Sequence, residues 1–225
     1  MKLTKKLTTT IAASAIAATM SFAPVANAEL GASVSVANMY LWRGFDLGDG
    51  SAAVSGDIVL SGAGFYGGIW GSSGDDTLGS EYDLFVGYGG EVGIFSYDLS
   101  VWNYNYPDAG LNGAGFGAQD GTAGELSEAI LSLGLGPVSL TYYDNIAGGS
   151  GYTYITLGAT FGAFSVTLGQ HSDELVGISG EKPTHLDLSY AYNDNVSFTV
   201  SKFIADEDFV DDDAQFVVSY SLPIE

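Results

Sequence analysis

The feature that most constrains this fold is the strict alternation of short and long connections along the chain. These connections join about twelve segments in which apolar and polar residues alternate. Short turns lie near Gly62, Gly90, Gly136, Gly162 and Asp194, and a longer loop follows each intervening segment. Apolar residues at every second position are typical of strands with one apolar face. Outer-membrane barrels join their strands by short periplasmic turns and longer extracellular loops, a rule that a soluble β-sandwich does not follow. The pattern therefore predicts an all-β fold, a transmembrane, antiparallel, up-and-down β-barrel of about 12 strands.

The first predicted strand covers residues 33–44 and shows how the two faces differ. Val34 and Val36 begin an apolar face, whereas the opposite face carries small residues and ends in Arg43, the only arginine of the chain. The same alternation is clear over residues 81–88, where tyrosine, leucine and valine alternate with Glu81, Asp83, Phe85 and Gly87. If the apolar face of the first strand contacts lipid, Arg43 points into the barrel.

The start of the chain has the features of a secretory signal peptide. Three lysines fall within the first six residues, a short apolar and alanine-rich run covers residues 11–22, and Ala26-Asn27-Ala28 has the small-x-small pattern of a cleavage site. The apolar run is shorter than the roughly 20 residues that a membrane-spanning helix needs. We therefore predict a cleaved signal peptide over residues 1–28 and a barrel domain over residues 29–225.

The charge balance is strongly acidic, with 27 acids against six basic residues. Three of these basic residues lie in the predicted signal peptide, which contains no acid. A surface of this charge repels nucleic acid phosphates and attracts cations, so no nucleic acid partner is expected. The chain contains no cysteine, which excludes disulfides and thiolate metal sites.

Several short motifs resemble those of a known family. They are Asn38-x-Tyr40-x-Trp42-Arg43-Gly44, Gly64-Phe65-Tyr66-x-Gly68-x-Trp70-Gly71-Ser72, Glu81-x-Asp83 and Tyr97-Asp98. In these motifs, which are densest over residues 33–107, the chain is similar to the TorF-type porin family of proteobacterial outer-membrane proteins, formerly catalogued as conserved hypothetical proteins. The resemblance implies a signal peptide, a location in the cell outer membrane and a porin-like barrel. It also implies the outer-membrane assembly machinery as a partner, although residues 222–225 lack the aromatic terminus usual in such barrels.

Seven charged residues are predicted to line the lumen, because a charge facing lipid at the bilayer midplane costs about 2 to 4 kcal/mol. They are Arg43, Asp57, Glu81, Asp83, Asp98, Glu128 and Asp187. One interpretation is a salt-bridged plug, in which Arg43 lies across the first hairpin from the neighbourhood of Asp57 and pairs with acids. The other is an eyelet, a ring of charges that sets ion selectivity. The acids outnumber the arginine in either case, so an open pore is expected to prefer cations.

The two histidines, His171 and His185, fall on the inward face at the extracellular ends of their strands. Together with Asp173 or Asp187 they are weak candidates for zinc or copper ligands. No third histidine and no metal-binding motif support such a site. The favoured interpretation is a pair of hydrogen-bonded lumen residues, and no cofactor is expected.

The most acidic loop covers residues 206–213 and contains six acids. It lacks the turn glycine and the terminal glutamate of an EF-hand loop, so a solvated extracellular loop is the favoured interpretation. Divalent cations shared between such a loop and surface lipopolysaccharide remain an alternative.

The sequence thus predicts a small outer-membrane porin or narrow channel, in contact with lipid and lipopolysaccharide and passing small solutes or ions. One alternative is a closed structural or surface-recognition barrel. Another is a lipid-modifying enzyme, but no G-x-S-x-G signature is present and no catalytic residue is predicted. His171 and Ser172 are adjacent and point to opposite faces, and His185 and Ser189 lie four residues apart, so neither pair has the reach of a nucleophile and its base.

Overall fold

The computed structural model describes residues 28–107, 126–148, 151–175, 180–205 and 210–224. Nearly all of the predicted signal peptide and part of the acidic loop of residues 206–213 lie outside these described residues. Within the described residues, no helix is long and apolar enough to cross a membrane.

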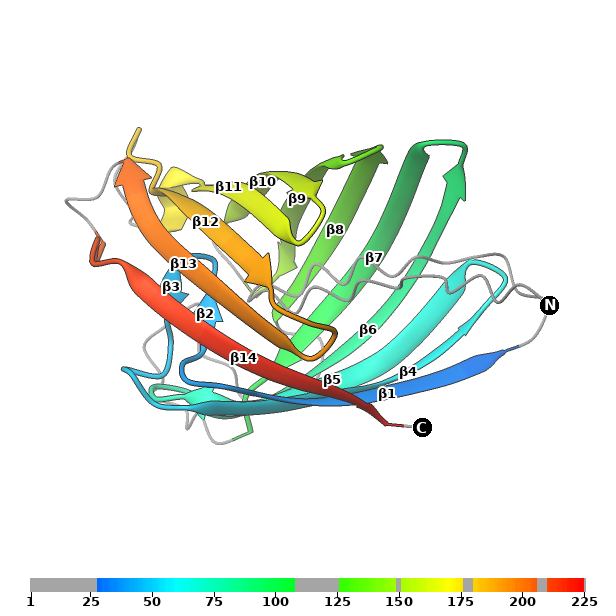
Figure 1. Cartoon of the computed structure of the whole chain (residues 1–225), viewed down its shortest axis with the longest axis horizontal. Helices are drawn as coiled ribbons and strands as arrows, with labels where there is room; N and C mark the ends of the chain where they lie inside the picture. Colours follow the sequence, from blue (N-terminus) through cyan, green and yellow to red (C-terminus); the bar gives the residue numbers. More distant parts are fainter. Residues whose placement is uncertain (1–27, 108–125, 149–150, 176–179, 206–209, 225) are drawn as a thin grey trace.

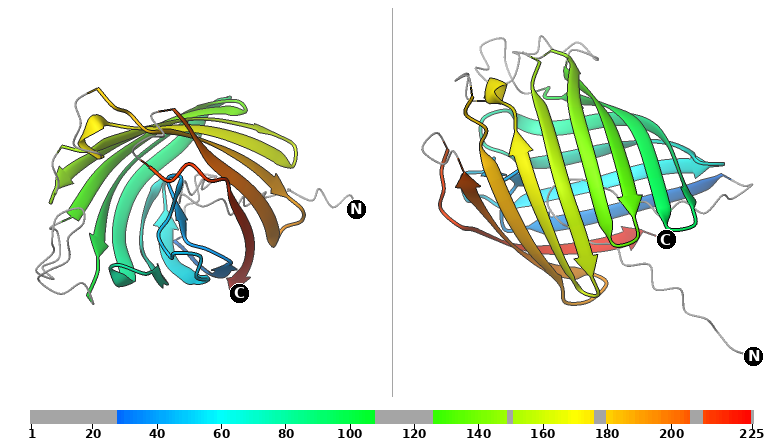
Figure 2. Two further views of the ribbon diagram at one scale, coloured as in Figure 1. Left: turned by 90° about the vertical axis from the view of Figure 1, so that its left-hand side faces the viewer. Right: turned by 90° about the horizontal axis from the view of Figure 1, so that it is seen from above.

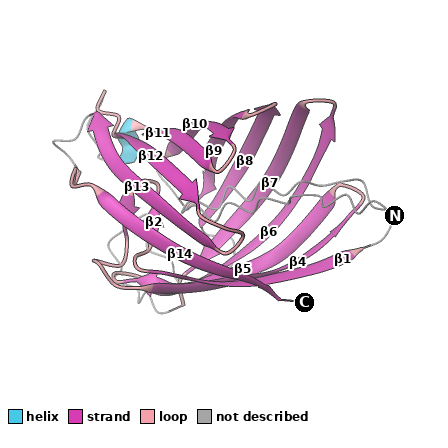
Figure 3. Ribbon diagram, in the orientation of Figure 1, coloured by secondary structure: helices cyan, strands magenta, loops and turns pink. Residues whose placement is uncertain are grey.

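Twelve antiparallel strands close into a barrel, as the sequence predicts (Figure 1). In the order of the chain these strands are β1 (Glu29–Ala37), β4 (Ala53–Gly62), β5 (Phe65–Asp75), β6 (Gly79–Val92), β7 (Phe95–Asn105), β8 (Leu126–Leu135), β9 (Val138–Ala147), β10 (Thr153–Phe161), β11 (Phe164–His171), β12 (Thr184–Ala191), β13 (Val196–Ala205) and β14 (Gln215–Ile224). Each strand pairs with its neighbour in sequence, and β1 closes the barrel against β14. Two very short strands, β2 (Leu41–Trp42) and β3 (Phe45–Asp46), form a separate hairpin, and a 3₁₀ turn, η1 (Asp173–Leu175), follows β11 (Figure 3).

The two faces of the wall follow the alternation in the sequence. On β6, Leu84 and Val86 are 44% and 60% exposed on the outside, whereas Glu81 and Asp83 on the inside are 6% and 2% exposed. Such an apolar outer band with a polar interior is the pattern of a barrel that lies in lipid. The register of the strands is therefore fixed by the solvent on each side, because a slip of one residue would move carboxylates to the lipid face.

The two ends of the barrel differ in their connections. The start of β1, the end of β14 and the short turns lie at one end, since Glu29 pairs with Ser61 beside the β4–β5 turn and Ala32 pairs with Ile224 (Figure 1). The longer connections lie at the opposite end. We call these the turn end and the loop end. In outer-membrane barrels the end with the longer loops is the extracellular one, so the same orientation is expected here.

The prediction of a first strand over residues 33–44 is wrong in its second half. The strand ends at Ala37, and the chain then leaves the wall and enters the lumen as the β2–β3 hairpin (Figure 2). Asn38 makes this exit, because its side chain accepts a hydrogen bond from Val218 N at 2.6 Å and donates one to Phe216 O at 3.0 Å. The Asn38 side chain thus takes up backbone groups of β14 that a longer β1 would bind. The hydrogen-bond ladder between β1 and β14 therefore ends here.

The inner surface is divided between two kinds of side chain. Large apolar and aromatic residues face inward from β4 to β10, namely Val59, Tyr66, Phe85, Trp102, Ile130, Tyr143 and Tyr154. Small hydroxyl residues dominate the inner face of β11 to β14 and β1, with hydrogen bonds between Ser35 and Ser221 at 2.9 Å and between Ser189 and Thr199 at 2.8 Å. The lumen therefore has one bulky wall and one small polar wall.

The assignment of the two ends predicts which residues an impermeant thiol reagent reaches on intact cells. Thr77→Cys and Asp211→Cys, at exposed positions of the loop end, are expected to be labelled. Asp194→Cys, at an exposed position of the turn end, is expected to be labelled only after the cells are broken. Labelling of Asp194→Cys alone on intact cells would reverse the orientation.

Candidate functional site

The inserted hairpin turns tightly at its tip. Trp42 pairs with Phe45, and the two residues between them, Arg43 and Gly44, have φ angles of 49° and 92°. Positive φ at both central residues is the pattern of a type I′ hairpin turn. Behind the tip, the carboxylate of Asp46 accepts hydrogen bonds from two backbone N–H groups, at 3.0 and 2.7 Å, which closes the return toward β4. The hairpin thus presents Arg43 at its innermost point.

Arg43 forms a two-point ion pair with Glu128 on β8. Nη1 donates to Oε1 at 3.0 Å and Nη2 donates to Oε2 at 2.6 Å, and both residues are 4% exposed. Tyr104 on β7 donates a further hydrogen bond to Glu128 Oε2 at 2.8 Å. The predicted pairing of Arg43 with an acid is confirmed. Its predicted place across the first hairpin from Asp57 is wrong, because the hairpin carries the guanidinium across the lumen to β8.

Aromatic rings surround the guanidinium. Its central carbon lies 4.7 Å from the ring centroid of Trp42, 4.4 Å from that of Tyr143 and 4.7 Å from that of Tyr154. A cation over a ring face gains about 0.5 to 2 kcal/mol, with the larger values where water is excluded. Burial raises the pKa of Tyr152, just before β10, to about 12, although Arg43 beside it acts in the opposite direction, so this phenol is neutral.

A closed ring of hydrogen bonds returns from the guanidinium to the backbone of the same residue. Arg43 Nη1 donates to Tyr152 Oη at 3.3 Å, Tyr152 Oη lies 2.7 Å from His171 Nδ1, and His171 Nε2 lies 2.9 Å from Arg43 O. A carbonyl oxygen only accepts, so His171 carries its proton on Nε2 and accepts from the phenol through Nδ1. Both ends of Arg43 are thus held by the barrel wall.

The structure brings the two histidines together, with ring centroids 6.0 Å apart and each side chain 1% exposed. His185 Nε2 lies 2.7 Å from Tyr154 Oη, and its Nδ1 lies 2.9 Å from Asp187 Oδ1. All four ring nitrogens therefore have protein partners, two of them phenols. A metal ion would have to displace these hydrogen bonds, and the metal site stays a prediction.

A second cluster lies at the base of the hairpin. Tyr40, which precedes β2, donates to Glu81 Oε2 at 2.5 Å, and Tyr106, which follows β7, donates to Glu81 Oε1 at 2.6 Å. Burial and, next, the charge of Glu81 raise the pKa of Tyr40 well above its usual value, so this phenol remains a donor. Asp83 lies two residues further along β6 and is 2% exposed.

The predicted lumen charges divide into two sets by depth. Arg43, Glu81, Asp83, Glu128 and Asp187, toward the loop end, are 2% to 8% exposed. Toward the turn end, Asp57 and Asp98 are partly exposed. Asp57 accepts a hydrogen bond from Ser33, and Asp98 accepts from Tyr66 Oη at 2.9 and 2.8 Å.

The aromatic residues around Arg43 were not predicted as a site. They are Trp42, Tyr104, Tyr143, Tyr152 and Tyr154. The signal was present in the strand parity, because Tyr143 and Tyr154 fall on the face opposite to Tyr142 and Ile155, which are 41% and 38% exposed. In the structure these two inward tyrosines share a partner in Arg43, whose central guanidinium carbon lies 4.4 and 4.7 Å from their ring centroids.

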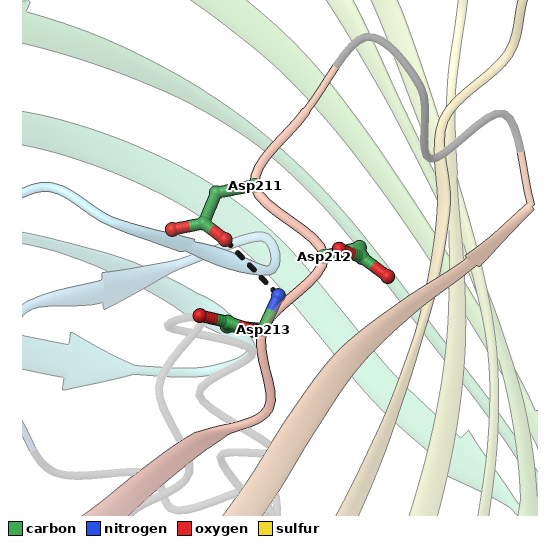
Figure 4. Close-up of side chains that lie close together, drawn as sticks. All are labelled: Asp211, Asp212 and Asp213. Atoms are coloured by element: carbon green, nitrogen blue, oxygen red, sulfur yellow. Dashed lines mark hydrogen bonds between the residues drawn. The ribbon is translucent and has the colours of Figure 1, made fainter.

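The acidic loop is described only over its second part. Carboxylate oxygens of Asp211, Asp212 and Asp213 lie within 4.8 Å of one another, and Asp213 N donates to Asp211 Oδ1 at 3.0 Å (Figure 4). Lys202 on β13 donates to Asp212 O at 2.8 Å. These contacts account for the local shape of an exposed loop segment.

Comparisons with known proteins give one family and a distant structural likeness. A family model described as a bacterial protein of unknown function (Gcw_chp) matches residues 21–218. A search of curated protein sequences found no significant match. Among solved structures, the outer membrane phospholipase A from Escherichia coli aligns with a TM-score of 0.42 and 11% identity, covering 87% of this chain and 90% of that chain. An active-site mutant of the same enzyme aligns with a TM-score of 0.41 and 12% identity over the same shares of the two chains.

Proposed function

We propose that this chain, which belongs to the Gcw_chp family of bacterial proteins of unknown function, forms a narrow, cation-preferring channel of the outer membrane that the inserted hairpin closes. The observation that carries this proposal is the charge of the inner wall. Six carboxylates face inward, at Asp57, Glu81, Asp83, Asp98, Glu128 and Asp187. The single guanidinium is neutralised by Glu128. The remaining negative charge attracts cations into a space with low-dielectric walls.

The exposure of these charges supports a channel that is closed at one end. Asp57, which accepts a hydrogen bond from Ser33 of the small polar wall, and Asp98 on β7 are both partly exposed toward the turn end. Toward the loop end the carboxylates are buried beneath the hairpin. The proposed channel therefore has a polar vestibule on the periplasmic side, and this vestibule ends at a plug on the extracellular side. A twelve-stranded barrel is also narrower than the 16- to 18-stranded porins, so small ions and solutes are the expected cargo.

The plug is held by non-covalent contacts alone, since the chain has no cysteine. The inserted segment connects the neighbouring strands β1 and β4, and these two strands pair at Ala37 and Ala53, directly on either side of it. The hairpin can therefore leave the lumen without a change in the barrel ladder. The ion pair between Arg43 and Glu128, however, favours a second candidate function, a permanently closed barrel with a structural or surface-recognition role.

Conductance in planar bilayers distinguishes the two candidates. The native protein is expected to show small, infrequent openings. A variant in which a short glycine-serine linker replaces residues 38–52 is expected to conduct steadily, because Ala37 and Ala53 are already paired neighbours and the wall stays closed. No conductance in this variant would reject the channel in favour of the closed barrel. Anion preference in it would reject the proposed cation selectivity.

The sign of the selectivity is expected to depend on the vestibule acids. Under a salt gradient, the reversal potential of the linker variant is expected to show cation preference. Asp57→Asn together with Asp98→Asn is expected to reduce it, because these carboxylates remain exposed to the lumen. Asp211→Asn with Asp212→Asn removes the same charge from the exposed loop and serves as the matched control, with little expected change.

A further inference from the structure

We propose that Glu81 and Asp83 on β6, together with Ser72 on β5, bind a hard divalent cation of the size of Ca²⁺. The site lies on the inner wall beneath the hairpin. This proposal concerns binding and does not depend on whether the barrel conducts.

The strand register brings the three side chains together. Glu81 and Asp83 are two residues apart, so they lie on the same face of β6 and both point into the barrel. Ser72 pairs directly with Glu81 across the β5–β6 ladder, and Trp70 pairs with Asp83. Directly opposed residues on one face have Cβ atoms about 4.5 to 5.5 Å apart, so Ser72 lies beside Glu81, and Asp83 is its diagonal neighbour at about 7 to 8 Å.

Two buried oxygen atoms of this cluster have no hydrogen-bond partner, Asp83 Oδ1 and Ser72 Oγ. Asp83 is 2% exposed and Ser72 is 7% exposed. Within the described residues, no ion pair joins Glu81 or Asp83 to a basic side chain, and Arg43 is already engaged by Glu128. Buried charges are costly unless they are paired or coordinate a metal, so this cluster requires a positive partner.

The kind of partner follows from the atoms that lack one. A proton shared by the two carboxyl groups would compensate part of the charge, but it would leave Ser72 Oγ without a contact. A cation between the carboxylates and the hydroxyl uses both orphan oxygens at once. The donors are all oxygen atoms and the carboxylates supply two negative charges, which suits Ca²⁺ and disfavours metals that prefer nitrogen or sulfur ligands. Water molecules would complete the coordination shell.

Two phenols fix the position of Glu81 for this role. Tyr40 and Tyr106 each donate to one of its carboxylate oxygens, at 2.5 and 2.6 Å. Each oxygen retains a second lone pair, which remains available to a cation. Because Tyr40 belongs to the segment that enters the lumen, a bound cation would also hold the base of the hairpin against β6.

Terbium luminescence tests the site directly, because Tb³⁺ replaces Ca²⁺ in oxygen sites and emits when a nearby aromatic residue is excited. Trp70 is that residue, since it pairs with Asp83 and its ring centroid lies 6.1 Å from that of Tyr40. Purified full-length barrel is expected to show saturable, tryptophan-sensitised Tb³⁺ emission that Ca²⁺ displaces. Asp83→Asn and Glu81→Gln are each expected to weaken the Tb³⁺ affinity by about tenfold or more, and Ser72→Ala by less, because ligand charge sets much of the affinity of such sites.

Three controls separate this site from other carboxylates. Asp98→Asn makes the same change on β7 toward the turn end and is expected to leave the emission unchanged. Replacement of Asp211, Asp212 and Asp213 by asparagine removes the exposed acidic cluster and is expected to leave it unchanged as well. Trp70→Phe is expected to reduce the emission that is excited selectively through tryptophan, while calorimetry still detects Ca²⁺ binding. Folding of every variant is verified by its faster migration on a gel before heating than after.

Two results would overturn the proposal. One is the lack of Ca²⁺-displaceable emission in the native protein. The other is unchanged emission in both Asp83→Asn and Glu81→Gln. Either result would leave a shared proton as the partner of the two carboxyl groups.

Discussion

Glu128→Ala is expected to lower the free energy of unfolding by about 3 to 5 kcal/mol, the cost of leaving one member of a buried ion pair without its partner. The guanidinium of Arg43 is 4% exposed, so it cannot recover its hydration while the hairpin remains inside. Tyr104, which donates to Glu128 at 2.8 Å, loses its acceptor in the same variant. Urea unfolding in lipid vesicles measures the loss.

A double variant shows whether the loss comes from the unpaired charge. Arg43→Met combined with Glu128→Leu replaces the pair with apolar groups of similar volume, and such replacements are often neutral or stabilising. We expect this variant to recover most of the stability that Glu128→Ala loses. A loss of less than about 1 kcal/mol in Glu128→Ala would mean that the pair is solvated, as exposed pairs are.

Gly44→Ala is expected to lower the free energy of unfolding by about 2 to 5 kcal/mol and to displace the tip of the hairpin. The φ angle of Gly44 is 92°, and a Cβ atom there would lie 2.9 Å from His185 Cγ and 2.9 Å from Phe203 Cζ. A left-handed backbone costs a residue with a Cβ atom about 1 to 2 kcal/mol, and overpacking against buried rings adds about 1 to 3 kcal/mol. The same urea titration measures the change.

Gly50→Ala is the matched control, because it imposes the backbone cost without the contact. Gly50 has a φ angle of 78°, and a Cβ atom there would meet nothing within 4 Å. We expect a loss of about 1 to 2 kcal/mol in this variant. Equal losses in Gly44→Ala and Gly50→Ala would contradict the close packing of the hairpin tip against β12 and β13. Steady conductance in Gly44→Ala alone would in addition support the hairpin as the plug.

The barrel could be predicted from the sequence because the pattern that specifies each strand is local and periodic. Each strand needs only an apolar face for lipid and a polar face for the lumen, and Leu84 beside Asp83 already shows both. The alternation of short and long connections then predicts that the strands close into a barrel with a turn end and a loop end. The inward direction of carboxylates such as Glu128 and Asp187 follows from the same parity, because lipid excludes them.

The hairpin could not be predicted in this way, because its position depends on residues far away in the chain. Arg43 contacts Glu128 at a separation of 85 residues, and its carbonyl binds His171 at a separation of 128 residues. The alternation over residues 33–44 continues through the point where the chain leaves the wall, so parity placed Arg43 inside while missing the hairpin that carries it. Arg43 and Gly44 both have positive φ angles, but of the two only Gly44 is a residue type that signals such a turn in the sequence.

The origin of the plug in the first part of the chain constrains the order in which this protein can be assembled. The hairpin belongs to the connection between β1 and β4, but the surface that receives it is built by β8 and by strands that come later, including Phe203 on β13, whose ring centroid lies 4.8 Å from that of Phe45. Docking of the hairpin therefore has to wait until the second half of the chain has paired. Until then the lone arginine must remain hydrated, and the acidic inner wall stays open to water. Contacts of such long sequence separation form slowly, so loss of permeability is expected to trail closure of the wall.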